Sequence, residues 1–364
     1  MRVKAVFPGH YIQGCGVIGE LPDLIDKLGN RALLLASKSV ISGIISGYPD
    51  VFSLRNISVD KFNGECCNKE LDRINGKIRD LGIDVMIGMG GGKVIDTAKI
   101  CADNTGIPVI VIPTIASTDA PCSGCAVVYR ENGVFEEVLY QKSNPTVVMV
   151  DLDIIAASPH RFIVSGMGDA LATWFEARSC YRTMSMNECG GHSTGAGMNI
   201  ARLCYDTLLE YGLMAKIANE NSLVSPALEY IVEANILLSG IGFESCGIAC
   251  AHAVHNGLTI LQESHDYYHG EKVAFGVLTG LHLTGSSKEE IDEVYSFCES
   301  IGLPTTLADI GLDYRDRMQL QKVAIETCKP GSSIYNEASQ INPDTVLNAI
   351  LMADATGRQR RKKA

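Results

Sequence analysis

The sequence has no apolar stretch of the roughly 18 uninterrupted residues that a membrane-spanning helix needs. Its first residues also lack the longer apolar region of a signal peptide. Both absences predict a cytoplasmic protein without a membrane partner. An excess of basic residues is missing as well: 31 lysines and arginines face 42 acidic residues, and the net charge of −11 repels nucleic acid.

Cysteine motifs that could hold a structural metal are scarce. One CxxC motif, Cys122 to Cys125, has no second pair to complete a structural zinc site. The 13 cysteines are odd in number, and most fall inside helix-like or strand-like patterns. We therefore expect reduced core residues, with redox or metal use of the CxxC motif as the alternative.

Low-complexity linkers and repeats of 20 to 50 residues are absent. With 46% hydrophobic and 20% charged residues, the composition is that of a globular protein. The length of 364 residues predicts two domains. We interpret the basic run from Arg358 to Lys363 as a solvated chain end, with contact to an anionic partner as the alternative.

Short apolar runs of strand length dominate the first part of the chain. Continuous runs of this kind are typical of parallel strands that are buried on both faces. The runs are 31–36, 83–87, 108–112 and 147–151. A helical pattern over 65–82 separates the first two, and an Asn-Gly pair between 126–129 and 135–140 predicts a hairpin.

Helical patterns replace strands in the second part of the chain. They cover 163–181, 195–215, 226–238, 246–261, 272–283 and 288–301. The sequence therefore predicts an α/β fold, with an N-terminal Rossmann-like parallel-sheet domain over 1–158 and an all-α domain over 159–364. The active site is expected in the cleft between them.

A glycine-rich turn follows the strand run 83–87. Gly90, Gly91 and Gly92 precede Lys93 and open a helix. Glycines allow close backbone approach, and the N–H groups at a helix start bind phosphate, so the pattern predicts pyrophosphate binding. A tight strand-to-helix turn is the alternative, because the segment is neither a GxGxxG nor a P-loop motif.

Four of the eight histidines lie between His252 and His269. In a helix, residues three apart share a face, so His252 and His255 can point into one site. From spacing alone, a histidine of this group is either a metal ligand or a buried core residue. The HExxH motif of zinc proteases is absent. Asp169 is either a metal ligand or a negative charge that stabilises the start of its helix. His265 is expected at the surface.

These segments together resemble the glycerol dehydrogenases, the metal-dependent polyol branch of the iron-containing alcohol dehydrogenase superfamily. The resemblance extends from Pro8 to about Arg358. The matching segments are 88–93, 96–99, 113–121, 168–174, 240–245, 252–257 and 269–273.

The resemblance implies the residues of an active site. Asp169, His252 and His269 would bind zinc, or iron(II) as the alternative, and leave a position open for substrate oxygen. His255 would lie near the nicotinamide, and Asp119 would hydrogen-bond the polyol. The cofactor would contact Gly90, Gly91, Gly92, Lys93, Asp96, Thr114, Ser117 and Ser37.

The activity implied is oxidation of glycerol or a related small vicinal diol to the hydroxyketone, with hydride transfer to NAD, by a homo-oligomer, an octamer in the family. Ser37 stands where NAD-using members carry an acid, and with Lys38 it leaves NADP possible. The alternatives are a glycerol-1-phosphate dehydrogenase, a 3-dehydroquinate synthase-like enzyme, or an inactive nucleotide-binding protein.

Overall fold

The computed structural model describes residues 2–53 and 56–362, which form two compact units. One unit holds Phe7–Pro159 and Ala218–Glu229. The other holds the described residues of Met1–Val6, His160–Ile217 and Tyr230–Ala364. We call them the sheet unit and the helical unit. The domain boundaries expected from the sequence stay a prediction.

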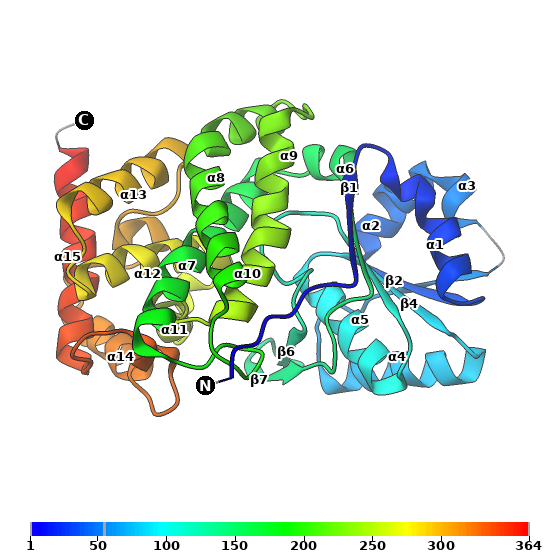
Figure 1. Ribbon diagram of the computed structural model, residues 1–364, viewed down its shortest axis with the longest axis horizontal. Coiled ribbons are helices and arrows are strands. Elements are labelled where there is room, and N and C mark those ends of the chain that lie inside the picture. The colour runs from blue at the N-terminus through cyan, green and yellow to red at the C-terminus, as the bar shows by residue number, and fades with distance from the viewer. Residues whose placement is uncertain (1, 54–55, 363–364) are drawn as a thin grey trace. The chain divides into compact units, whose positions relative to one another are not determined.

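The sheet unit is built on six parallel strands (Figure 1). In spatial order they are β1 (His10–Gly14), β8 (Val147–Asp151), β5 (Val109–Pro113), β4 (Val85–Gly90), β2 (Ala32–Ala36) and β3 (Ile57–Lys61). The strands β2, β4, β5 and β8 are buried along their whole length, as the apolar runs predict. Strand β3 lies beside β2 on one side, and β5 lies beside β4 on the other side, so the strand order reverses between β2 and β4. In open parallel sheets, ligands bind at such a reversal, outside the carboxyl ends of the two strands.

Helices and one hairpin complete the sheet unit. The helices are α1 (Leu21–Leu28), α2 (Lys38–Gly43), α3 (Pro49–Phe52), α4 (Asn68–Leu81), α5 (Gly92–Thr105) and α6 (Leu152–Ala156), with 3-10 turns at Val17–Glu20 and Ile45–Gly47. The predicted hairpin is present as antiparallel strands β6 (Cys125–Tyr129) and β7 (Phe135–Tyr140). The buried Lys99 ammonium donates to the carbonyl oxygens of Ala120 and Cys125 at 2.8 and 2.5 Å, and so holds the loop that leads into the hairpin.

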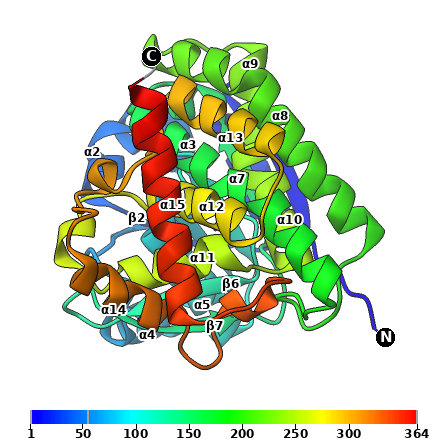
Figure 2. The same cartoon turned by 90° about the vertical axis from the view of Figure 1, so that its left-hand side faces the viewer.

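Helix α12 (His269–Leu283) is the helix with the most extensive packing in the helical unit (Figure 2). The other helices are α7 (His160–Thr183), α8 (Gly195–Glu220), α9 (Pro226–Glu233), a π-helical segment (Ala234–Leu238), α10 (Ser239–Cys246), α11 (Cys250–Leu258), α13 (Lys288–Ile301), α14 (Arg317–Thr327) and α15 (Pro343–Arg361), with 3-10 turns at Gln262–Ser264, Leu307–Ile310 and Ser333–Asn336. The end of α8 and the first half of α9 belong to the sheet unit. Helix α12 contacts α7, α11 and α15. The mixed α/β fold predicted from the sequence is confirmed.

Among the described residues, no single helix is long and apolar enough to cross a membrane. The pair Pro226–Cys246 and Cys250–Leu258 meets the length and composition requirements only when both parts are taken together, and a bend of 100° separates them.

The interpretation of the basic C-terminal run as a solvated end is wrong for Arg358 and Arg360, whereas Arg361 is exposed as expected. They belong to the last turns of α15, where Arg358 pairs with Asp354 at 2.7 Å and its guanidinium lies 3.9 Å from the ring centroid of Tyr314. Arg360 pairs with Asp292 and Glu299, both at 2.8 Å. These arginines therefore fasten α15 to its neighbours. Lys363 lies outside the described residues.

Candidate active site

The glycine turn lies at the point where the winding of the sheet reverses. Gly90 ends β4 with a φ of 158°, and Gly91 is the N-cap residue of α5. As a glycine, this N-cap residue has no side chain with which to cap the helix start. The first N–H groups of α5 can therefore donate hydrogen bonds to a phosphate group, which the positive end of the helix dipole also favours.

Two further residues of the predicted cofactor site flank this turn. In the strand register Ala36 of β2 lies opposite Met89, so Ser37 follows directly beside Gly90. On the other side the N–H of Thr114 donates to the carbonyl oxygen of Gly90 at 3.1 Å. Ser117 is half-buried and Asp119 is buried, both in the loop after β5.

The remaining two predicted cofactor residues have partners within the sheet unit. Lys93 pairs with Glu65 at 2.6 Å, and its ammonium lies 5.0 Å from the ring centroid of Tyr129. The buried Asp96 carboxylate accepts a hydrogen bond from the N–H of Val127 at 3.1 Å and so fastens β6 to α5. Cofactor contacts of Lys93 and Asp96 stay a prediction.

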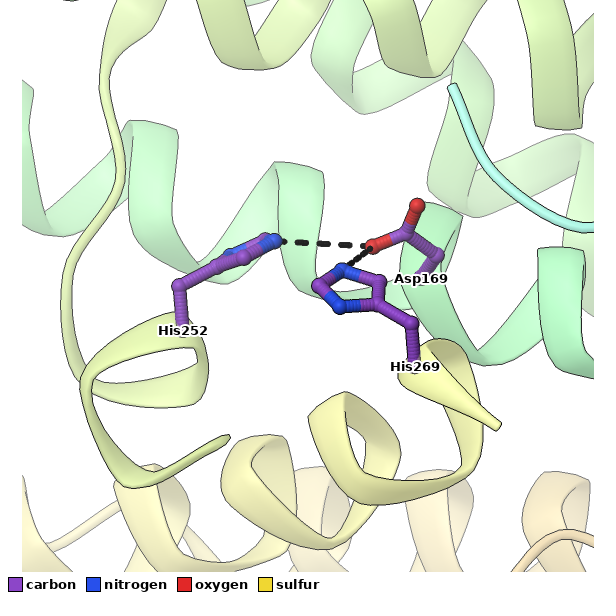
Figure 3. A group of neighbouring side chains, drawn as sticks. All are labelled: Asp169, His252 and His269. Atoms are coloured by element: carbon purple, nitrogen blue, oxygen red, sulfur yellow. Dashed lines mark hydrogen bonds and ion pairs between the residues drawn. The ribbon is translucent and has the colours of Figure 1, made fainter. Parts of the chain in front are cut away.

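The structure brings together Asp169, His252 and His269, the three predicted metal ligands (Figure 3). One donor atom from each lies within 4.8 Å of the other two. The Asp169 Oδ1 atom is 3.1 Å from His269 Nε2 and 3.5 Å from His252 Nε2. One carboxylate and two imidazoles on separate helices form a donor set that suits zinc or iron(II).

Close packing of helices positions two of these ligands. Gly168 of α7 directly precedes Asp169, and Gly270 of α12 directly follows His269. A Cβ atom on Gly168 would lie 2.3 Å from the carbonyl oxygen of Gly270, so the two backbones touch. Asp169 lies in the third turn of α7, which begins at His160; the alternative of a charge near the helix start is therefore wrong.

Charged neighbours shift the pKa values of Asp169 and His252. Burial would raise the pKa of Asp169, but the two histidines hold it well below its usual range. Burial would lower the pKa of His252, yet the Glu176 and Asp169 carboxylates raise it well above its usual value. A divalent cation would place its positive charge directly beside the Asp169 carboxylate.

His255, also predicted near this site, lies behind His269 rather than beside Asp169. Its Nε2 atom is 3.1 Å from His269 Nδ1. Burial, together with the charges of His269 and Lys272, holds the pKa of His255 well below its usual value. His265 is exposed at the surface, as expected.

Comparison with known proteins identifies the family. Residues 8–152 match the family described as iron-containing alcohol dehydrogenase. A glycerol dehydrogenase of Thermotoga maritima is 48% identical over 99% of both chains. The chain belongs to the glycerol dehydrogenases of this family. The resemblance seen in the sequence is thus confirmed, and the protein is an oxidoreductase.

One solved structure and one further relative extend the comparison. The crystal structure of a probable glycerol dehydrogenase from Sinorhizobium meliloti superposes with a TM-score of 0.93, at 46% identity, and covers 98% of this chain and 99% of its own. A protein of Halobacterium salinarum named glycolaldehyde reductase is 42% identical over 98% of both chains. Relatives with this degree of sequence identity are therefore named after more than one substrate.

Two buried carboxylates near the candidate ligands were missed in the sequence. Glu176 lies two turns after Asp169 on α7 and contacts His252, while Glu337 contacts the start of α11. An acidic residue seven positions after Asp169 in an otherwise apolar helix is a signal that could have indicated Glu176. No local pattern marks Glu337.

Glu337 makes the stability of the metal-free protein depend on pH. Burial, with a contribution from Glu176, raises the pKa of Glu337 from 4.5 to about 7. The folded state therefore binds a proton that the unfolded state releases, and stability falls as pH rises between these two values. The Glu337→Gln variant keeps an acceptor for the N–H of Cys250 but does not titrate.

We expect Glu337→Gln to match the wild type at pH 5 and to exceed it at pH 8 by on the order of 2 kcal/mol in the free energy of unfolding. Urea unfolding of metal-free protein at both pH values measures the difference. An equal difference at pH 5 and pH 8 would show that Glu337 does not titrate as proposed.

Proposed function

We propose that this enzyme oxidises glycerol or a related small vicinal diol to the hydroxyketone, with a nicotinamide cofactor as hydride acceptor and zinc as the bound metal. The convergence of Asp169, His252 and His269 is the observation that carries the proposal. The identity of 48% to a glycerol dehydrogenase supports the choice of substrate.

The metal, when bound, would supply a Lewis acid that lowers the pKa of a substrate hydroxyl. Asp169, His252 and His269 would hold it through one carboxylate oxygen and two imidazole nitrogens. The glycine turn and the start of α5 would bind the cofactor diphosphate, and Asp119 would hydrogen-bond a polyol hydroxyl. A phosphorylated substrate is disfavoured, because Lys272 is buried and donates to the carbonyl oxygen of Ser264 at 3.3 Å.

Steady-state rates of the purified enzyme with glycerol, 1,2-propanediol and 2,3-butanediol, each with NAD and NADP, test this function. Reduction of glycolaldehyde is measured in the same series. We expect the highest kcat/KM for a vicinal diol with NAD. A higher value for glycolaldehyde reduction, or for glycerol 1-phosphate, would reject the proposed substrate class.

We further propose a homo-oligomer, which the family resemblance suggests to be an octamer. Several large apolar side chains of α8 are exposed in the single chain, among them Leu203, Met214 and Ile217. Exposed apolar patches of this kind are typical of subunit interfaces. Light scattering should give a mass well above the 39.2 kDa of one chain, and a mass near that value would contradict the proposal.

Ser37 sets the preference between NAD and NADP in this proposal. Its hydroxyl caps α2 by accepting the N–H of Val40 at 3.3 Å. Aspartate is an equally good helix cap, so Ser37→Asp should fold normally. The new carboxylate would accept hydrogen bonds from the ribose hydroxyls and repel a 2′-phosphate.

We expect Ser37→Asp to shift the ratio of kcat/KM values toward NAD by roughly 10- to 100-fold, the scale of one charge-assisted hydrogen bond. Ser42→Asp, which adds the same charge one turn further along α2, is the control and should shift the ratio far less. An unchanged ratio in Ser37→Asp would mean that Ser37 does not face the ribose.

A further inference from the structure

Two buried glutamates cap the start of α11 behind the three candidate ligands. Glu176 is 1% exposed and Glu337 is 7% exposed. The Glu176 Oε1 atom accepts the N–H groups of Ala249 and His252 at 2.8 and 3.0 Å, and Glu337 Oε1 accepts that of Cys250 at 3.0 Å. The N-cap residue, Ala249, has no side-chain acceptor of its own. The two carboxylates therefore satisfy N–H groups that a helix start leaves unpaired.

Only Glu176 also reaches a ligand side chain. Its Oε2 atom lies 2.6 Å from His252 Nδ1. An ionised carboxylate can only accept hydrogen bonds, so His252 Nδ1 must carry the proton. In the neutral form of the ring, which is the form that binds a metal, the lone pair then lies on Nε2, the atom that faces Asp169.

The second histidine has a neutral partner in the equivalent place. His269 Nδ1 lies 3.1 Å from His255 Nε2, and His255 Nδ1 lies 3.1 Å from the side-chain oxygen of Asn256. Protons on both Nδ1 atoms satisfy this chain of hydrogen bonds and leave His269 Nε2 free toward Asp169. Both ligand histidines thus present Nε2, but only His252 is backed by a negative charge.

We propose that Glu176 is a positioning residue that fixes the tautomer and orientation of His252 and thereby sets the affinity of the site for its metal. The inference rests on the proposed function in so far as the site binds a metal. A carboxylate behind a ligand imidazole makes the imidazole more basic and orients its ring. With Asp169, Glu176 also brings two negative charges to the site, which balance one divalent cation.

The dissociation constant for Zn²⁺, measured by chelator competition on the purified full chain, tests this role. We expect Glu176→Gln to weaken Zn²⁺ binding by roughly 10- to 100-fold, the usual cost of losing an outer partner of a ligand. Glu337→Gln is the matched control, because it caps the same helix start without touching a ligand. Its dissociation constant should stay within about threefold of the wild-type value, as expected for a residue outside the ligand set.

Nitrogen NMR of histidine in the Zn²⁺-loaded protein gives a readout that loss of helix capping alone would not change. In the wild type His252 Nδ1 should carry a proton that is hydrogen-bonded to a carboxylate, and its signal should shift in Glu176→Gln but not in Glu337→Gln. If Glu176→Gln does not fold, Glu176→Asp replaces it, and the shorter carboxylate should weaken binding as well.

Equal weakening in Glu176→Gln and Glu337→Gln would overturn the inference, because capping alone would then explain it. An unchanged dissociation constant in Glu176→Gln would overturn it too. Failure of the wild type itself to bind Zn²⁺ would instead reject the metal site of the proposed function.

Discussion

Replacement of Asp169 by asparagine is expected to abolish metal retention and to lower kcat/KM for diol oxidation by on the order of 10³-fold. The amide has no charge to offset a divalent cation, and several kcal/mol of charge stabilisation in the transition state are lost with the metal. The fold should survive, because the helical unit has its own buried core around α12. Metal content by mass spectrometry and kcat/KM on the same sample measure both effects.

Asp354→Asn is the matched control for this variant. Asp354 is also 1% exposed in the helical unit, but its carboxylate contacts Arg358 and the N–H of Leu307, not a candidate ligand. This variant should lose stability and keep its metal. If Asp169→Asn still held one ion per chain with wild-type affinity, the assignment of this residue as a ligand would be wrong.

Replacement of Gly91 by valine should weaken NAD binding by roughly 10- to 100-fold, the scale of one or two lost phosphate hydrogen bonds. Gly91 has a φ of −87°, so its conformation does not require glycine. An added Cβ would lie 3.2 Å from the flexible tip of Ile115, which can yield. The side chain would instead obstruct the backbone approach to the start of α5.

Titration of NAD by fluorescence or calorimetry gives the dissociation constant, and the metal content of Gly91→Val should stay at the wild-type level. Gly76→Val is the control, since Gly76 lies on α4 with no atom within 4 Å of an added Cβ. Equal NAD affinity in Gly91→Val and the wild type would place the diphosphate elsewhere.

The sequence predicted those parts of the fold whose side chains are uniformly buried. The strands β2, β4, β5 and β8 appear as continuous apolar runs, and all four lie inside the sheet. The strands β1 and β3 were missed because they form the two edges and have several half-buried or exposed residues. The hydrogen bonds of an edge strand depend on its neighbour, which local sequence does not show.

The candidate site was predicted less completely from the residues alone. The spacing of His252 and His255 was compatible with a metal site, whereas the resemblance supplied the full set of ligands. Asp169 could not be assigned from its pattern, since the start of α7 at His160 decides between a helix charge and a ligand. The roles of Glu176 and Glu337 depend on contacts across more than 70 residues of sequence, which no local pattern specifies.

Metal titration of the chelator-stripped enzyme tests whether a metal ion at Asp169, His252 and His269 is required for diol oxidation with a nicotinamide cofactor. Stripped protein, shown by circular dichroism to be folded, is titrated with Zn²⁺ while reduction of NAD by glycerol is followed at saturating NAD and glycerol. We expect no turnover without metal and full recovery at one ion per chain. Undiminished turnover in the stripped, demonstrably metal-free protein would contradict it.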